Sequence, residues 1–112
     1  MHLMEQARQM FPDETGVKNT AVYILRLASG MRYVGSTTDL IQRMADHIAG
    51  IACKTTRDTK PISLIYVEPQ KDYSSARKRE AQFKRWSRAK KEALASGDLD
   101  SLRQLSKSRE SQ

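Results

Sequence analysis

Apolar and β-branched residues gather in three short runs of this chain, each bounded by residues that favour turns. The first two runs, residues 21–28 and 31–35, are separated by Ser29-Gly30, a dipeptide typical of a tight hairpin turn. A third run, residues 62–69, alternates apolar and polar positions and then becomes apolar. The pattern therefore predicts a β-hairpin in the first half of the chain and a third strand after its middle.

Helical spacing of apolar residues follows the second and the third strand. Apolar positions at i, i+1, i+4 and i+8 predict a helix over residues 40–48 that Gly50 ends, and a polar loop over 51–61 follows it. A long helix is expected over about residues 75–95, ended by Gly97. Each helix has three candidate N-caps: Thr37, Thr38 or Asp39 for the first, and Asp72, Ser74 or Ser75 for the second.

The two ends of the chain carry weaker signals. Residues 1–16 show little periodicity and predict a loose extension or a short helix around residues 3–10. A last short helix is expected over residues 99–105, followed by a polar tail that frays. We therefore expect a single domain over residues 20–96, of element order β-β-α-β-α-α. A flexible or briefly helical extension, 1–19, precedes it, and a short helix with a polar tail, 97–112, follows it.

Composition narrows the class of protein. The chain has 112 residues, is 38% hydrophobic and carries a net charge of +7, which favours a polyanionic partner, nucleic acid first. No apolar run approaches the ~20 residues that span a bilayer, and the first residues do not form a signal peptide, so we expect a soluble, cytoplasmic protein without a membrane partner. The single cysteine, Cys53, excludes a disulfide framework and a cysteine-based zinc cluster, and a buried or idle thiol is expected.

Most of the excess charge lies on the predicted long helix. Between residues 77 and 92, eight Lys and Arg residues outnumber two Glu residues. This stretch is either an ordinary solvated helix face or a surface that binds phosphates. The candidate phosphate-binding residues are Arg77, Lys78, Lys84, Arg85, Arg88 and Lys91.

Glu80 interrupts the apolar face of the same helix. It lies at helical spacing with Ala76 and Phe83, where an amphipathic pattern calls for another apolar side chain. It either pairs with Arg77 or Lys84, or seats a divalent cation, since Mg²⁺ takes one or two protein carboxylates together with water and phosphate.

Two further pairs suggest chemistry. Arg43 and His47 are four residues apart and share one flank of the first predicted helix. They form either a solvated helix edge or a functional pair, in which Arg43 donates hydrogen bonds to a phosphate and His47 transfers a proton. Tyr23 and Tyr33 lie on the paired strands of the predicted hairpin. Each is either a core residue or, where cations help it lose its proton, a base.

In their order and spacing these residues resemble the GIY-YIG nuclease superfamily. The first half-motif corresponds to Val22-Tyr23-Ile24, which keeps the tyrosine, and the second to Tyr33-Val34-Gly35. Arg43 and His47 follow on one helix, and Glu80 follows on the next. The resemblance covers roughly residues 20–95, and the string of residues 83–91 is similar to the small stand-alone bacterial branch.

The resemblance implies an α+β fold, a small three-stranded antiparallel sheet flanked by helices, and phosphodiester hydrolysis with one Mg²⁺ or Mn²⁺. It assigns Glu80 to the metal, Arg43 to the charge that develops in the transition state, and Tyr23 and Tyr33 to water activation and phosphate binding, with Tyr23 favoured as the base. His47 matches a histidine found in many branches, and Gly35 is expected to let the backbone turn tightly beside the site.

The family's late asparagine has no counterpart here. Several members carry an Asn after the metal-binding Glu, whereas the one asparagine of this chain is Asn19. Gln82, Lys84 or Trp86 could take its place.

Three functions remain open from the sequence. The first is a metal-dependent endonuclease acting on DNA, structured or damaged DNA included and RNA not excluded, in repair or recombination, without a small-molecule cofactor. The second is a non-catalytic module that binds nucleic acid through the basic helix and stacks bases on its tyrosines. The third is a scaffold that recruits a partner through Trp86 and the C-terminal leucines.

Overall fold

The computed structural model describes residues 3–10 and 20–110, with side chains to residue 105. Its centre is an antiparallel sheet of β1 (Ala21–Leu27), β2 (Arg32–Thr37) and β3 (Pro61–Pro69), in the order β2-β1-β3. The hairpin turn contains Gly30 at a φ of 90°, a conformation that suits glycine. The predicted α+β class and three-stranded antiparallel sheet are confirmed, with the hairpin's first strand in the middle.

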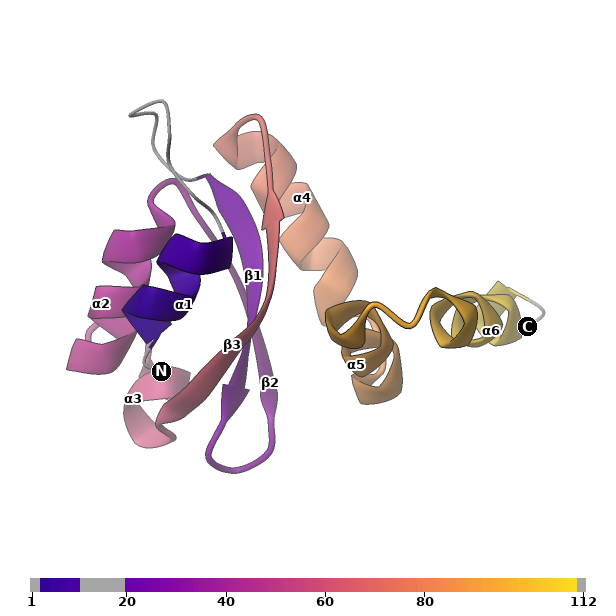
Figure 1. The fold of residues 1–112 in the computed structure, drawn as a ribbon, viewed down its shortest axis with the longest axis horizontal. Helices are drawn as coiled ribbons and strands as arrows, with labels where there is room; N and C mark the ends of the chain where they lie inside the picture. Colours follow the sequence, from indigo (N-terminus) through magenta and orange to yellow (C-terminus); the bar gives the residue numbers. More distant parts are fainter. Residues whose placement is uncertain (1–2, 11–19, 111–112) are drawn as a thin grey trace.

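Helices cover both faces of this sheet (Figure 1). On one face, α1 (Leu3–Met10) and α2 (Leu40–Ala49) pack against Tyr23, Leu25 and Leu27, which alternate along β1. On the other face, Phe83 of α4 (Tyr73–Lys84) packs against Val22, Ile24 and Val34. The short helix expected around residues 3–10 is observed, and its Leu3 and Ala7 are buried in the core. The rest of the expected extension, residues 1–2 and 11–19, lies outside the described residues.

Helix α2 begins and ends where its caps predict. The Asp39 side chain accepts a hydrogen bond from the Gln42 backbone amide, and Gly50 ends the helix in the left-handed region, at a φ of 77°. The prediction of a polar loop over residues 51–61 is wrong in part, because residues 54–58 form a short helix, α3 (Lys54–Asp58). It packs on α2 through the buried Thr56, and a single turn of this kind has no apolar periodicity that sequence could reveal.

The single long helix expected over residues 75–95 is also wrong. Two helices replace it, α4 with Asp72 as its N-cap and α5 (Arg88–Ser96) with Ser87 as its N-cap. Between the two helices, the Trp86 backbone amide donates a hydrogen bond to the Phe83 carbonyl. The ring centroids of Trp86 and Phe83 lie 4.8 Å apart. Burying Trp86 against Phe83 therefore directs the chain away from the axis of α4.

The last helix, α6 (Leu99–Glu110), is longer than expected and takes in residues predicted to fray. It extends from α5 away from the sheet (Figure 1). In the ranges that the structure describes, no helix combines the length and apolar character needed to cross a membrane.

Candidate active site at the edge of strand β2

A buried hydrogen-bonded chain links β1, α2 and α3. The Tyr23 hydroxyl lies 2.7 Å from His47 Nε2, and His47 Nδ1 lies 2.8 Å from Thr56 Oγ1. Tyr23, His47 and Thr56 are each no more than 2% exposed. Of the sequence alternatives for His47, the solvated helix edge is therefore wrong, since the ring lies inside the protein.

Burial keeps both rings neutral near neutral pH. Desolvation, reinforced by the charge of Arg43, lowers the pKa of His47 to about 4, well below the ordinary value. Desolvation also raises the pKa of Tyr23 far above its ordinary range, and the nearby Arg43 offsets only a small part of that increase. The site thus holds a neutral phenol against a neutral imidazole.

Tyr33 is joined to this chain through Cys53, the N-cap residue of α3. The Tyr33 hydroxyl donates a hydrogen bond to the Cys53 sulfur, and burial together with this bond raises the pKa of Tyr33. The same sulfur lies 3.3 Å from Thr56 Oγ1. Although burial opposes it, these hydroxyl donors and the backbone amides of α3 lower the pKa of Cys53. The thiol, expected to be buried or idle, is partly buried and lies in contact with a candidate site residue.

Gly35 is required for a different reason from the one that its motif suggests. It lies within β2, opposite Tyr23, and it is not among the described glycines with positive φ, so the expected tight turn is wrong. A Cβ at this position would lie 2.5 Å from Tyr23 Cζ, and closer still to the hydroxyl. Glycine therefore makes room for the Tyr23 ring to cross β2.

Glu80 lies on the opposite face of the sheet, on α4. Ser36 Oγ donates a short hydrogen bond to one carboxylate oxygen, and Lys84 Nζ lies 2.6 Å from the other, so the predicted ion pair with Lys84 is present. Burial raises the pKa of Glu80, but the hydrogen bonds from Lys84 and Ser36 outweigh it and hold the pKa below its ordinary value. The negative charge of Glu80 raises the pKa of both Tyr23 and Tyr33, which places all three within electrostatic reach of one another.

Arg43 supplies the positive charge on the α2 side. It is partly exposed, and its charge lowers the pKa of Tyr23, Tyr33 and His47. The structure therefore brings together all five catalytic candidates around the β2 edge of the sheet. Sequence reasoning missed Ser36 and Thr56, and it missed the role of Cys53. Only Ser36, a small polar residue directly after Gly35, gave a signal that could have been read.

The carboxylate of Glu80 is suited to a divalent cation. Its pKa is held below the ordinary value, its side chain is 17% exposed, and Lys84, the partner of one oxygen, is 55% exposed. No group of three or more His, Cys, Asp or Glu side chains forms a metal site in the described parts of the chain. A cation here would take Glu80, waters and a phosphate, a donor set that Mg²⁺ accepts.

The residues considered for the missing asparagine separate in the structure. Lys84 contacts Glu80, whereas the Gln82 side chain accepts a hydrogen bond from Arg79. Trp86 packs against Phe83. Among the three, Lys84 is therefore the residue in contact with the carboxylate.

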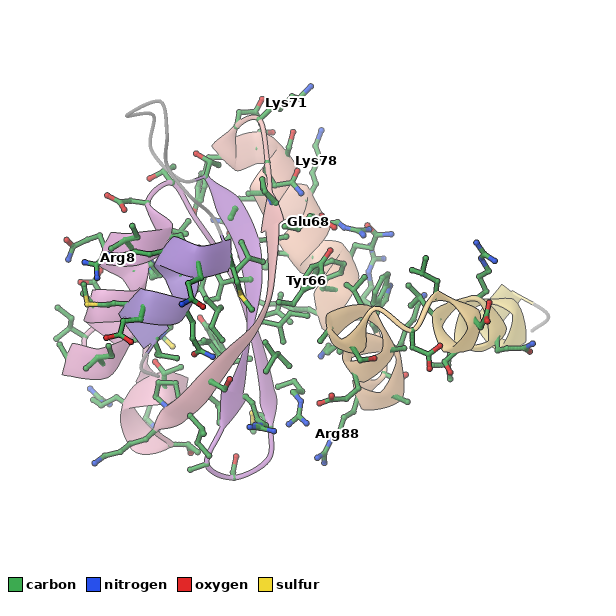
Figure 2. The ribbon with its side chains drawn as sticks, in the orientation of Figure 1. Arg8, Tyr66, Glu68, Lys71, Lys78 and Arg88 are labelled. Atoms are coloured by element: carbon green, nitrogen blue, oxygen red, sulfur yellow. The ribbon has the colours of Figure 1, made fainter. Side chains whose placement is uncertain are left out.

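The basic stretch is not one continuous helix face. Arg79 points inward to Glu68, at 2.8 Å, and its guanidinium lies 4.3 Å from the centre of the Phe83 ring. The Lys90 ammonium lies 4.1 Å from the centre of the Trp86 ring. The six candidate phosphate-binding residues divide between α4 with its C-cap (Arg77, Lys78, Lys84, Arg85) and α5 (Arg88, Lys91). In Figure 2, Lys78 lies on the upper part of α4, whereas Arg88 of α5 lies at the bottom of the view, toward the hairpin turn.

The fold and this cluster define a nuclease-type domain, and comparison with known families agrees. The model of the GIY-YIG catalytic domain matches residues 19–93, so the chain belongs to the GIY-YIG catalytic domain family. This family consists generally of endonucleases that use divalent metal ions, which implies a nucleic acid as substrate.

The chain is also similar to proteins of the UPF0213 group. A UPF0213 protein from Listeria monocytogenes is 44% identical over 63% of this chain and 80% of its own length. One from Halobacterium salinarum is 42% identical over 65% of this chain and 95% of its own length. A solution NMR structure of the UPF0213 protein from Bacillus halodurans is 36% identical, with coverage of 69% of this chain and 82% of that chain and a TM-score of 0.45.

Proposed function

We propose that this protein is an endonuclease that hydrolyses phosphodiester bonds in DNA with one divalent cation, Mg²⁺ or Mn²⁺, held by Glu80. The observation that carries the proposal is the buried Tyr23–His47 pair, 2.7 Å apart, whose Tyr23 lies within electrostatic reach of Glu80. A module that only binds nucleic acid has no need for an ionised carboxylate near a phosphate, nor for a proton-transfer pair.

Tyr23 and His47 act as a proton relay in this proposal. The Tyr23 oxygen accepts a proton from the attacking water while its own proton passes to His47 Nε2. The water oxygen bonds to phosphorus, and the bond from phosphorus to the leaving sugar oxygen breaks. The sugar oxygen keeps the bonding electrons and takes a proton from solvent water, and His47 returns its extra proton to solvent through Tyr23. Because burial disfavours both a phenolate and an isolated imidazolium, the two transfers occur in concert, and the negative charge of the phosphate offsets the charge on His47.

Arg43 and Glu80 handle charge around the phosphate. The Arg43 guanidinium donates hydrogen bonds to the phosphate oxygens as their charge grows, a role in which losing one donor typically costs about 2.7 to 4 kcal/mol of barrier. The cation, when bound at Glu80, supplies Lewis-acid stabilisation of the same oxygens. Tyr33 is expected to hold the phosphate, and to do so its hydroxyl must turn its single proton from the Cys53 sulfur to a phosphate oxygen.

DNA binding is assigned to the exposed cations of α4 and α5. Contacts of these cations with phosphates supply most of the affinity in this proposal, so binding should weaken steeply with salt. Branched or damaged DNA, and hence a role in repair or recombination, is the substrate class that such sequence-independent binding suits.

A nicking assay tests this function. Supercoiled plasmid, branched DNA, single-stranded DNA and RNA are incubated with the protein in Mg²⁺, in Mn²⁺ and in EDTA. We expect cleavage of DNA with either cation, no cleavage in EDTA, and none by Glu80→Gln. Asp100→Asn, which changes an exposed acid on α6, serves as the control and should cleave normally. Cleavage that persists in EDTA or in Glu80→Gln contradicts the metal mechanism, and binding without cleavage on every substrate supports the non-catalytic module.

A further inference from the structure

The hydrogen bonds around His47 determine which of its ring nitrogens carries the proton. Near neutral pH the ring is neutral, so one nitrogen donates and the other accepts. Tyr23 is 1% exposed, and the hydrogen bond to Nε2 is the one that the structure gives its hydroxyl within the described ranges. A buried hydroxyl proton requires an acceptor, so it points to Nε2, which must then be unprotonated.

The proton on the other nitrogen fixes the direction of the next bond. With Nε2 unprotonated, Nδ1 carries the hydrogen and donates it to Thr56 Oγ1 at 2.8 Å. The hydroxyl of Thr56 has a single proton of its own, which is then directed to the Cys53 sulfur at 3.3 Å. That sulfur also accepts from Tyr33, so the hydroxyl hydrogens of Tyr23, Thr56 and Tyr33 and the hydrogen on His47 Nδ1 each have an acceptor.

We propose that Thr56, held by Cys53, is a positioning residue that fixes His47 in the tautomer whose Nε2 can accept the proton of Tyr23. The inference rests on the proposed function, because it matters for catalysis only if His47 takes part in the relay. Thr56 is 2% exposed, and it acts through the orientation and protonation of the imidazole.

The tautomer is measurable without any enzymatic assay. In ¹⁵N-histidine-labelled protein, long-range ¹⁵N–¹H correlation spectra distinguish a protonated ring nitrogen from an unprotonated one. A His2→Gln background leaves His47 as the single histidine of the sequence. We expect a protonated Nδ1 and an unprotonated Nε2 in this background, and a loss of that pattern in Thr56→Val, which keeps the shape of the side chain and removes its hydroxyl.

Two matched variants separate positioning from general damage. Thr56→Ser restores a hydroxyl and should restore the parent spectrum, and Thr55→Val, at the exposed neighbouring position, should leave it unchanged. An amide spectrum of each variant checks that it is folded. An Nε2-protonated ring in the parent, or a parent-like tautomer in folded Thr56→Val, overturns the proposal, and the parent spectrum alone decides it if Thr56→Val does not fold.

The catalytic arm of the test is read separately. If the parent cleaves DNA, Thr56→Val should lower kcat roughly 10- to 100-fold, the range seen when the hydrogen-bond partner of a metal-bound histidine is lost, with KM unchanged and with rescue by Thr56→Ser. A kcat equal to that of the parent contradicts a role in the relay. If the parent cleaves nothing, the proposed function fails, while the spectra still show whether Thr56 sets the tautomer.

Discussion

Acidification from pH 7 to pH 5 should destabilise this protein mainly through one residue, His47. Its pKa is about 4 in the folded state, against about 6.5 for an exposed histidine in the unfolded chain. Between these values the unfolded state binds more protons than the folded state, so stability falls as the pH falls. The contribution is complete above the unfolded pKa and is lost as the pH drops toward the folded one.

The size of the effect follows from the two pKa values. The difference between the folded and unfolded pKa of His47 contributes about 3 kcal/mol to the free energy of unfolding, and about 2 kcal/mol of this is lost by about pH 5. Screening by solvent does not reduce this figure, because the His47 side chain is 1% exposed. The pKa values of three carboxylates, Glu80, Asp72 and Asp98, are held below their ordinary values. These groups therefore lose their stabilising charge only at a pH below the range from 7 to 5 considered for His47.

Urea unfolding followed by the fluorescence of Trp86, the single tryptophan, measures the change. In a His2→Gln background, a loss of about 2 kcal/mol should move the urea midpoint by roughly 1 M between the two pH values, given the usual dependence on denaturant. His47→Gln, which cannot ionise, should show little change between them even though it starts less stable. Equal losses in the two proteins, or a parent midpoint that does not move, would refute the buried neutral imidazole.

Two substitutions on β2 test the remaining contacts of the site. Gly35→Ala places a methyl group against the Tyr23 ring and should cost about 1–3 kcal/mol of stability, measured by the same urea titration; an unchanged midpoint would show that Tyr23 does not cross β2 at Gly35. Ser36→Ala removes a hydrogen bond to the ionised form of Glu80 and should raise the pKa of Glu80, followed by the ¹³C shift of its carboxylate during a pH titration. A pKa equal to that of the parent would show that Ser36 does not stabilise the ionised carboxylate.

The backbone elements could be predicted because their signals are local. The apolar run of β1, the alternation in β3, the Ser29-Gly30 turn and the helix end at Gly50 each act within a few residues, and the structure confirms them. Of the three candidate caps for α2, Asp39 is the one observed. The continuous helix over residues 75–95 failed because its break depends on a tertiary contact. Trp86 is partly buried against a cluster that includes Val22 and Ile24 of the sheet, and this contact turns the chain at the end of α4. The Ser87 cap that begins α5 is a local signal that the sequence reasoning missed.

Only those site residues whose spacing along the chain carries a signal could be predicted. The spacing of Tyr23, Tyr33, Arg43, His47 and Glu80 carried the family resemblance, and the structure gathers these residues around one sheet edge. The contacts of Thr56 with His47 and of Cys53 with Tyr33 join a short helix to residues up to 20 positions away, through side-chain geometry that no sequence period encodes.

The sheet divides the site into a neutral half and a charged half. Tyr23, His47 and Thr56 form a buried, uncharged relay beneath α2 and α3, whereas Glu80 and Lys84 form an ion pair on α4, across the sheet. A phosphate that reaches both halves must lie across β2, which is an edge strand because β1 pairs with it on one side only. The edge position of β2 is therefore a requirement of the proposed reaction, since a further strand paired with it would block the path between the relay and Glu80.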